Sequence, residues 1–408
     1  MTNKVIGPNY SKIINVLIFI FPIVIISLKV AGDLVLFILA MMGIFIAISQ
    51  KLLPFNIKEI KVFSYLTLGY FLAVCLSVIF SGKAAELAHF IPRDLHFLFA
   101  PFIALALFKA EINLKYLLIG AKVALLILGI IIFYQYFIIG ANRPSGIMNA
   151  GVFGNLAVSI FLITLVFLKH ESFKHKILSC LSLLSGLFII VASGTRGAWL
   201  SLLLLLVIYL YFFYKQKNKL SLISNITAVF IISGLVFFVG FNEIVHDRVY
   251  SAYTDTLSWL SGDQVTSSSG LRLEMYRLAI EKIEDVPFFG HGYRTSNVVV
   301  FENSTTPGGR LSYTFNHLHN AYLTQFFNGG FVLLGALLLL LFVPLRLFIK
   351  ANIQNRDNPI YIAGVMLTSG YASFGMINIL FGDTYMNGFY VFFLAILMLL
   401  TNKSKKAL

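Results

Sequence analysis

Acidic residues and cysteines are scarce in this chain of 408 residues. Asp and Glu number 17 against 31 Lys and Arg, and charged residues of both signs make up only 12% of the sequence. Soluble globular domains average about 25% charged residues, so this composition argues against a soluble fold. The two cysteines, Cys75 and Cys180, both fall inside apolar runs. We therefore expect them to pack as small apolar side chains and not to form a disulfide or a metal site.

Long apolar runs take the place of the missing charge. Hydrophobic residues make up 59% of the chain, in runs of about 18 to 25 residues, the length that an α-helix needs to cross a bilayer. The runs lack the alternation of membrane β-strands. We count twelve, at about residues 12–28, 31–50, 62–81, 92–109, 117–139, 152–168, 177–193, 197–213, 222–241, 320–345, 359–380 and 386–401. The sequence therefore predicts an all-α polytopic membrane protein with about twelve transmembrane helices.

The basic residues are distributed as a membrane topology requires. If the N-terminus lies in the cytoplasm, the inner segments hold 17 of the 21 lysines, whereas eight of the ten arginines fall elsewhere. Lysine-rich inner loops follow the positive-inside rule. The net charge of +14 therefore reports topology, and no nucleic-acid partner is expected. We predict that both termini and residues 215–219 face the cytoplasm, and that residues 242–318 lie outside.

One loop is much longer than the others. It joins the ninth and tenth apolar runs and contains two stretches with a helical pattern, at residues 243–260 and 270–286. We therefore divide the chain into three parts. Residues 1–241 carry transmembrane helices 1 to 9, residues 242–318 form a helical outer subdomain, and residues 319–408 carry helices 10 to 12 and a cytoplasmic tail.

The arginines expected on the outer side suggest an anionic ligand, because the planar guanidinium binds phosphate through two donors. Arg143 lies in the glycine-punctuated stretch NRPSGIMNAGVFGN and Arg196 in SGTRGAW; contact with lipid headgroups is the alternative role for either residue. Arg272 follows a helix-start signal and has no acidic residue at i+3 or i+4, which favours phosphate binding. Arg277 has acidic residues at i−3 and i+4, so an ordinary surface ion pair explains it.

Polar side chains open the tenth apolar run, in the stretch FNHLHNAYLTQFFNGG at residues 315–330. An imidazole of ordinary pKa can accept a proton near neutral pH, which makes His319 a candidate base. Asn320 beside it could orient a substrate hydroxyl or the ring. One alternative is that the histidines merely cap the helix. A metal site is disfavoured, because His317 and His319 would point to different faces of a helix and no HExxH motif or nearby acidic residue completes a metal shell.

Three stretches in order, SGTRGAWL, GLRLEMYRLAIEKIEDVPFFGHGY and HLHNAYLTQFFNGGFVLLG, resemble the superfamily of O-antigen ligases and O-antigen polymerases over about residues 140–345. The resemblance implies a metal-independent glycosyltransferase without a cofactor, in the bacterial inner membrane, with its active site facing the periplasm. Such an enzyme takes a glycan from undecaprenyl diphosphate and, as a ligase, transfers it to a hydroxyl of lipid A–core in lipopolysaccharide biosynthesis.

The resemblance also assigns roles to residues. It places the catalytic pair of the family on His319 and Asn320, and the diphosphate-binding arginines on Arg196 and Arg272, with a looser match for Arg143. The predicted site comprises the catalytic candidates His319, Asn320 and His317 and the diphosphate- or substrate-binding candidates Arg196, Arg272, Arg143 and Arg277. Family members often carry an acidic residue in the following helical turn, where this chain has Gln325 and Asn328.

Two other functions stay open. Polymerases of the superfamily commonly show two sizeable outer loops, whereas one loop dominates here, which favours a ligase. A lipid-linked oligosaccharide flippase is the alternative outside enzyme chemistry. Transporters tend to show internal repeats and charged residues near the middle of the membrane, and this sequence shows neither clearly.

Overall fold

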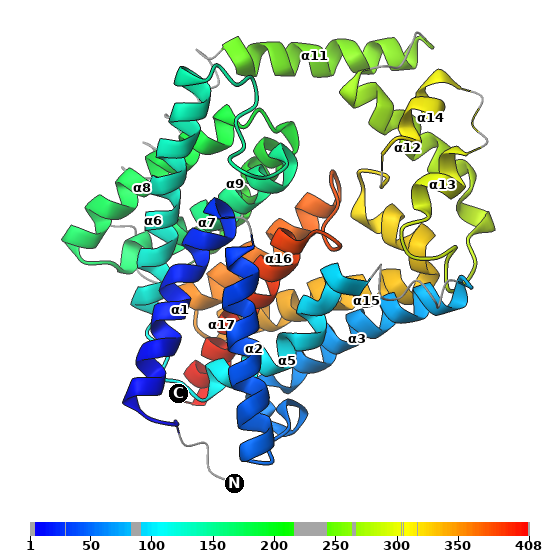
Figure 1. Cartoon of the computed structure of the whole chain (residues 1–408). Coiled ribbons are helices and arrows are strands. Elements are labelled where there is room, and N and C mark those ends of the chain that lie inside the picture. The colour runs from blue at the N-terminus through cyan, green and yellow to red at the C-terminus, as the bar shows by residue number, and fades with distance from the viewer. Residues whose placement is uncertain are drawn as a thin grey trace.

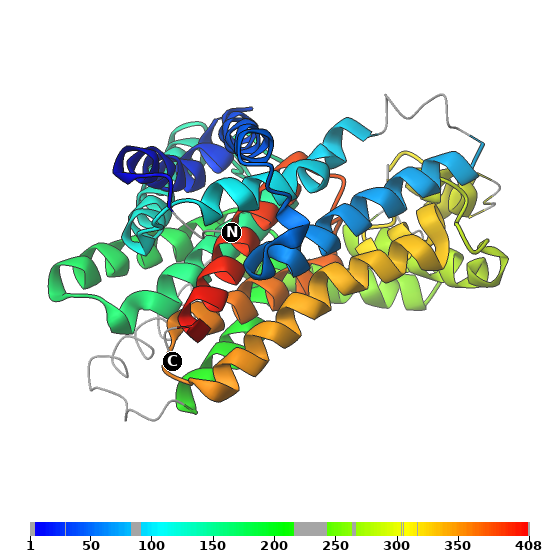
Figure 2. The same ribbon diagram turned by 90° about the horizontal axis from the view of Figure 1, so that it is seen from below.

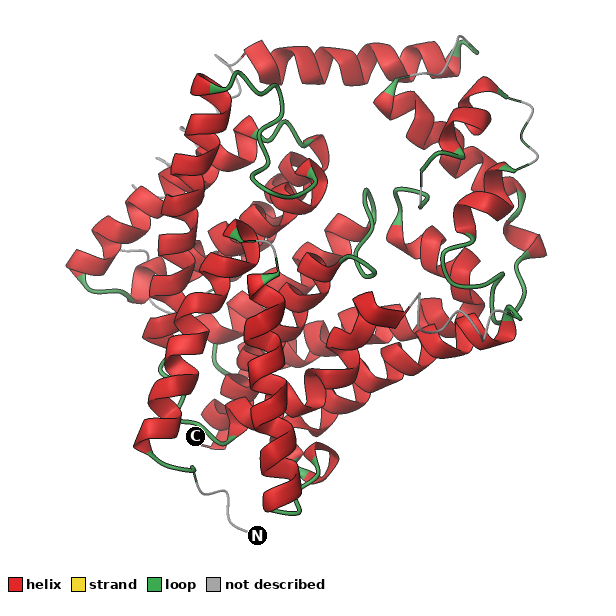
Figure 3. Cartoon of the chain, viewed as in Figure 1, coloured by secondary structure: helices red, strands yellow, loops and turns green. Residues whose placement is uncertain are grey.

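The computed structural model describes residues 5–28, 30–82, 91–215, 243–262, 267–302, 304, 306–315 and 317–406. Within these residues every regular element is a helix (Figure 3). Ten of the described helices are long and apolar enough to cross a membrane. The predicted class, an all-α polytopic membrane protein, is confirmed.

The membrane helices follow the predicted apolar runs. They are α1 (Pro8–Ser27), α2 (Ala31–Ser49), α3 (Lys58–Phe80), η3 with α5 (Ile91–Asp94 and Leu95–Phe108), α6 with η4 (Leu114–Phe133 and Tyr134–Ile138), α7 with η5 (Ala150–Phe167 and Leu168–His170), α8 (Phe173–Ala192), α9 (Arg196–Tyr214), α15 (Ala321–Gln354), α16 (Pro359–Gly375) and α17 (Thr384–Lys406). α16 has 17 residues and is shorter than the ten candidate spans. The predicted run at residues 222–241 lies outside the described residues.

α7 and α17 form the centre of the bundle. In their most apolar windows 94% and 83% of the residues are buried, compared with 33% in α9 and α15. Around them α1 packs on α6, α2 packs on α5, and α15 packs on α3 and α16. A helix that is apolar on all sides must bury those sides against protein or lipid. The central helices use protein contacts, and the peripheral helices keep an apolar face for lipid.

A smaller subdomain interrupts the bundle between α9 and α15. It contains α11 (Glu243–Leu260), α12 (Ser268–Glu281), η6 (Ile283–Asp285), α13 (Ser296–Phe301) and α14 (Pro307–Ser312). α11 coincides with the first predicted helical stretch, and α12 overlaps the second, residues 270–286, but ends at Glu281. α11 extends from the side of α6 and α9 across to α12 (Figure 1). The start of α1 and the end of α17 lie away from this subdomain in both views (Figures 1 and 2).

α15 is broken near its start, and the subdomain fills the break. Gly330 has φ 59°, and a Cβ atom there would lie 2.0 Å from the carbonyl oxygen of Phe288. The amide of Phe331 donates a hydrogen bond to that carbonyl (3.0 Å), and the amide of His291 donates to the carbonyl of Phe327 (2.8 Å). A helix break inside a membrane protein needs such partners for its freed backbone groups. The loop between η6 and α13 thus fixes the first turns of α15.

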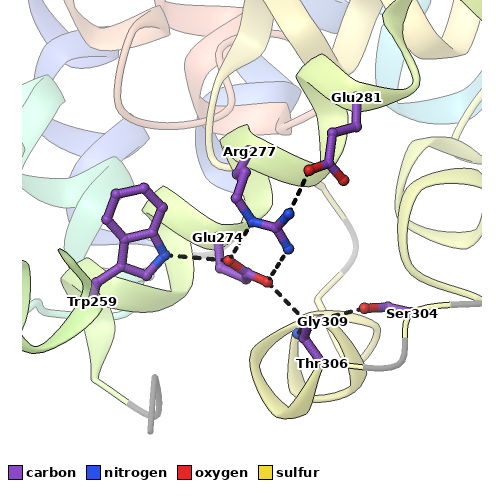
Figure 4. A network of polar contacts seen from close by, with 7 residues as sticks. All are labelled: Trp259, Glu274, Arg277, Glu281, Ser304, Thr306 and Gly309. Atoms are coloured by element: carbon purple, nitrogen blue, oxygen red, sulfur yellow. Dashed lines mark hydrogen bonds and ion pairs between the residues drawn. The ribbon is translucent and has the colours of Figure 1, made fainter. Parts of the chain in front are cut away.

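Glu274 joins three helices of the subdomain, as Figure 4 shows. Its carboxylate accepts hydrogen bonds from Arg277 on α12 (2.7 and 3.0 Å), from Thr306 at the start of α14 (2.8 Å) and from Trp259 on α11 (3.2 Å). Arg277 also pairs with Glu281. The ion pairs predicted for Arg277 at i−3 and i+4 are therefore confirmed. These bonds, that from Arg277 above all, hold the pKa of Glu274 at about 2.

Replacing Arg277 with alanine is expected to loosen the subdomain, because its ion pair with Glu274 is lost. The carboxylate of Glu274 would lose its strongest partner while staying mostly buried. Because the folded pKa lies below the ordinary value, this stabilisation is present above about pH 4.5 and is lost as the pH falls toward 2. Thermal unfolding of the purified variant at pH 7 and pH 4 measures the effect. A variant that unfolds at the wild-type temperature at both values would contradict it.

Candidate active site

A cavity of about 380 Å³ lies where the subdomain meets the helix bundle. Four of the seven predicted site residues line it, namely Arg143, Arg196, Arg272 and His319. These residues come from four separate segments of the chain, which the fold brings together. Arg248 from α11 also lines the cavity, although no sequence pattern singled it out. The described lining residues include no Asp or Glu, so the cavity is strongly positive.

Three helices begin at this cavity. Asn149 and Gly151 lie at the start of α7, Thr195 to Gly197 at the start of α9, and Ser268 at the start of α12. The first amides of a helix lack carbonyl partners inside the helix and carry a partial positive charge. Thr195 makes no capping hydrogen bond to α9; its hydroxyl donates to the carbonyl of Ala150 (2.9 Å). The helix ends therefore add to the positive potential of the arginines.

Arg196, the first residue of α9, is held by the subdomain. Its Nη1 donates to the hydroxyl of Ser269 (2.7 Å) and lies 3.7 Å from the carboxylate of Asp255. Within the described part of the chain, Nε and Nη2 have no such partner. A guanidinium tethered through one nitrogen keeps two parallel donors for an anion, the arrangement that suits bidentate phosphate binding.

Arg143 and Arg248 flank a single glycine. Gly194 has φ 61°, and a Cβ atom there would lie 3.7 Å from Nε of Arg248 and 3.9 Å from Nε of Arg143. Neither arginine has an ion pair with an acidic residue in the described chain. Partial burial and the charges of Arg248, Arg272 and Arg196 lower the pKa of Arg143. Four guanidinium groups beside a single carboxylate among the described residues, that of Asp255, repel one another, so the cluster favours an anionic ligand.

The loop that carries Arg143 is fixed by the π-helical turn η4. The side-chain oxygen of Gln135 accepts hydrogen bonds from the amides of Ser145 (3.2 Å) and Gly146 (2.9 Å), and its nitrogen donates to the carbonyl of Gly146 (3.1 Å). π-turns inside α-helices occur frequently at functional sites. Here the turn ends the membrane helix with a side chain that holds the next loop in place.

His319 has a strained backbone. Its φ is 49°, a left-handed conformation that residues other than glycine rarely adopt. Its carbonyl accepts a hydrogen bond from the hydroxyl of Tyr276 on α12 (3.0 Å), and its buried Nδ1 has no hydrogen-bond partner. The prediction that His317 and His319 point apart is wrong. α15 begins only at Ala321, and the turn at His319 brings the two ring centroids to 4.4 Å.

The two histidines are weaker bases than the sequence suggested. The pKa of His319 is lowered to about 3 by burial and by the charges of His317 and Arg272. Burial and Arg272 also lower the pKa of His317 to about 4, although a hydrogen bond with Asn378 acts in the opposite direction. The predicted ordinary pKa of His319 is therefore corrected downward. Both rings are neutral at physiological pH, and an anion beside Arg272 would offset part of the lowering.

The other three predicted site residues do not line the cavity; they are His317, Asn320 and Arg277. Asn320 caps α15, because its side-chain oxygen accepts from the amides of Tyr322 and Leu323 (3.0 Å each). Its nitrogen donates to the carbonyl of Met376 (3.3 Å). The capping role considered for the histidines thus belongs to Asn320, whose amide fixes the chain beside His319.

The turn after the histidines also has a structural use. Gln325 donates to the hydroxyl of Tyr70 (3.2 Å), and the side-chain oxygen of Asn328 accepts from the amides of Thr295 and Ser296. The side-chain amides of Gln325 and Asn328 thus fix this turn against α3 and the subdomain. Among the described residues, no group of three or more His, Cys, Asp or Glu side chains could hold a metal, and both cysteines are free.

The sequence did not single out Arg248, Asn155 or Asn378, which are among the residues that line the cavity. Arg248 lies in an ordinary-looking amphipathic stretch, and its only signal was membership of the outer arginines. Asn155 carried a clearer signal, since an amide inside an apolar run is costly in a membrane; it is 3% exposed in α7 and lines the cavity. Asn378 lies just after α16 and could not be linked to the cavity without the fold.

Comparison with known proteins gives a family match and a similar bacterial protein. Residues 181–340 match the model of a family described as O-antigen ligase. This region contains α9, the whole subdomain and the first part of α15, and therefore includes Arg196, Arg248, Arg272 and His319. The chain is also 28% identical over 367 residues to an uncharacterized protein of Haemophilus influenzae. The aligned region covers 86% of this chain and 89% of that protein.

Proposed function

We propose that this chain is an O-antigen ligase, because residues 181–340 match the model of that family. It transfers a glycan from undecaprenyl diphosphate to a hydroxyl of lipid A–core at the periplasmic face of the bacterial inner membrane. The observation that carries the proposal is the joint placement of Arg143, Arg196, Arg272 and His319 in one cavity. A cationic site for the diphosphate thus lies beside an imidazole that is free to accept a proton.

The residues suit the chemistry of glycan transfer from a diphosphate. The acceptor oxygen bonds to the anomeric carbon as the bond from that carbon to the diphosphate breaks, and the electron pair leaves with the diphosphate. The arginines stabilise this growing negative charge. The hydroxyl proton passes to the imidazole of His319, which is unprotonated at neutral pH. A diphosphate leaves without help from an acid, so the reaction needs no carboxylate pair.

Two features favour a ligase over the alternatives. Only residues 139–149 separate η4 from α7, whereas the subdomain between α9 and α15 is large, and this matches the single dominant loop expected of a ligase. The cavity lining comes from the starts of α7, α9 and α12 and from the end of α16. A flippase would need equivalent groups toward both membrane faces, and this cavity is built at one end of the bundle.

The glycan of a deletion strain tests the proposal. Without a ligase, long polymer accumulates on undecaprenyl diphosphate and disappears from lipid A–core; plasmid-borne wild type restores the attachment. Single repeat units attached to lipid A–core would instead identify a polymerase. Lipid-linked repeat units confined to the cytoplasmic leaflet would identify a flippase. Unchanged attachment of long polymer in the deletion strain would refute all three.

A further inference from the structure

α11 presents one arginine to the cavity and few other side chains. Arg248 is partly buried, whereas residues 246, 247, 249 and 250 around it are exposed. The neighbouring acid does not neutralise it, because Asp247 lies beside His246 (3.8 Å) and is about 80% exposed. Arg248 therefore has no ion pair in the described chain, and its charge acts on Arg143 and Arg196 nearby, so an anion bound there would be stabilised.

The four cavity arginines fall into two pairs. Arg143 and Arg248 both lie against Gly194. A Cβ atom at Gly194 would lie 3.9 Å from Nε of Arg143 and 3.7 Å from Nε of Arg248. Arg196 and Arg272 form the second pair, since Nη1 of Arg196 donates to Ser269 on α12 (2.7 Å) and Arg272 lies one turn further along the same helix and lines the same cavity. Gly194 and Arg196 are separated by one residue, so the two pairs lie next to each other. The spacing matches a ligand with two adjacent anionic groups.

We propose that Arg248 and Arg143 bind one phosphate of the carrier diphosphate while Arg196 and Arg272 bind the other, so that Arg248 selects diphosphate carriers over monophosphate carriers. The assignment rests on the proposed function and extends it to the specificity of the donor site. A polyprenyl monophosphate fills one pair and leaves the other unneutralised. A diphosphate fills both, and each charge-assisted contact is worth roughly 10- to 100-fold in affinity.

Direct lipid binding tests this selectivity independently of catalysis. Undecaprenyl diphosphate and undecaprenyl monophosphate are titrated separately into the purified full-length protein in lipid nanodiscs. We expect wild type to prefer the diphosphate. Arg248→Ala should weaken diphosphate binding by roughly 10- to 100-fold and change monophosphate binding by less than about threefold, so that most of the preference is lost. His246→Ala, on the same helix but exposed, is the matched control and should bind both lipids as wild type does.

Two further comparisons keep the outcome interpretable. Arg248→Lys keeps the charge and the fold of α11, and it should retain more of the preference than Arg248→Ala does. Equal loss of both lipids in Arg248→Ala, or no loss of either, would overturn the pairing. A wild-type protein that prefers the diphosphate but transfers no glycan would refute the proposed function and leave the pairing standing. A wild-type protein without preference would refute the pairing alone.

Discussion

Arg196→Ala is expected to lower glycan transfer by about 10²- to 10³-fold, the usual loss when one donor to a developing oxyanion is removed. Arg196 begins α9 and is tethered through Nη1 to Ser269 and Asp255, so its remaining donors are held in place before the ligand binds. Arg272→Ala should act in the same direction, because Arg272 lines the same cavity. In-vitro transfer from purified lipid-linked glycan, at equal protein level, measures both.

The lysine variant separates geometry from charge. Arg196→Lys should also be impaired, because an ammonium group cannot replace the two parallel donors of a guanidinium. Arg310→Ala removes an arginine that is exposed on α14 and should transfer at the wild-type rate. Full activity of Arg196→Lys would remove the bidentate argument, and an equal loss in Arg310→Ala would show that the effect is one of net charge.

The membrane helices could be predicted because the bilayer imposes their length. An apolar run of about 20 residues has few alternatives to a helix in hydrocarbon. The run at residues 31–50 therefore becomes α2 (Ala31–Ser49) almost residue for residue. The stretch at residues 243–260 was equally clear and became α11. The apolar runs do not predict which helices pack against each other, because this depends on complementary surfaces that are distant in sequence.

The candidate site was only partly predictable for the same reason. Arg196 and Arg272 stood in short motifs with local signals, so each could be found alone. Arg248 had no local signal, because its place in the cavity depends on a contact with Gly194, 54 residues earlier in the chain. The left-handed φ of His319 was missed because residues other than glycine adopt it uncommonly. The capping role of Asn320 was missed although asparagine is a preferred N-cap residue, because its side chain was assigned to the substrate or the imidazole ring.

The basicity of His319 was misjudged because a pKa depends on surroundings that sequence does not give. An isolated imidazole titrates near pH 6.5. In the fold the ring is buried, lies against His317 and shares the cavity with Arg272, and each of these lowers its pKa. The same arginine that would bind the donor therefore weakens the base. Donor binding and base strength are thus coupled through the charge of Arg272.

Alanine variants of the two histidines are expected to differ in their effect on transfer. His319→Ala should lower transfer by about 10²- to 10⁴-fold, the usual contribution of a general base, while donor binding is kept. His317→Ala should lose less, because its ring contacts His319 and does not line the cavity. Transfer by wild type should persist in EDTA, since the arginines supply the positive charge at the diphosphate.

For wild type, the pH dependence of kcat/KM reports the pKa values of the free enzyme. The pKa of His319 is about 3 there, so protonation of His319 should cause no loss of kcat/KM between pH 8 and 5. With donor bound, the diphosphate offsets the charge of Arg272 and raises the pKa of His319. Since a protonated ring cannot accept the hydroxyl proton, kcat should begin to fall at a higher pH than kcat/KM does. Identical acid limbs in both profiles would refute the coupling. If His317→Ala were inactive and His319→Ala active, His317 would be the base. The assignment of the base to His319 would then be wrong.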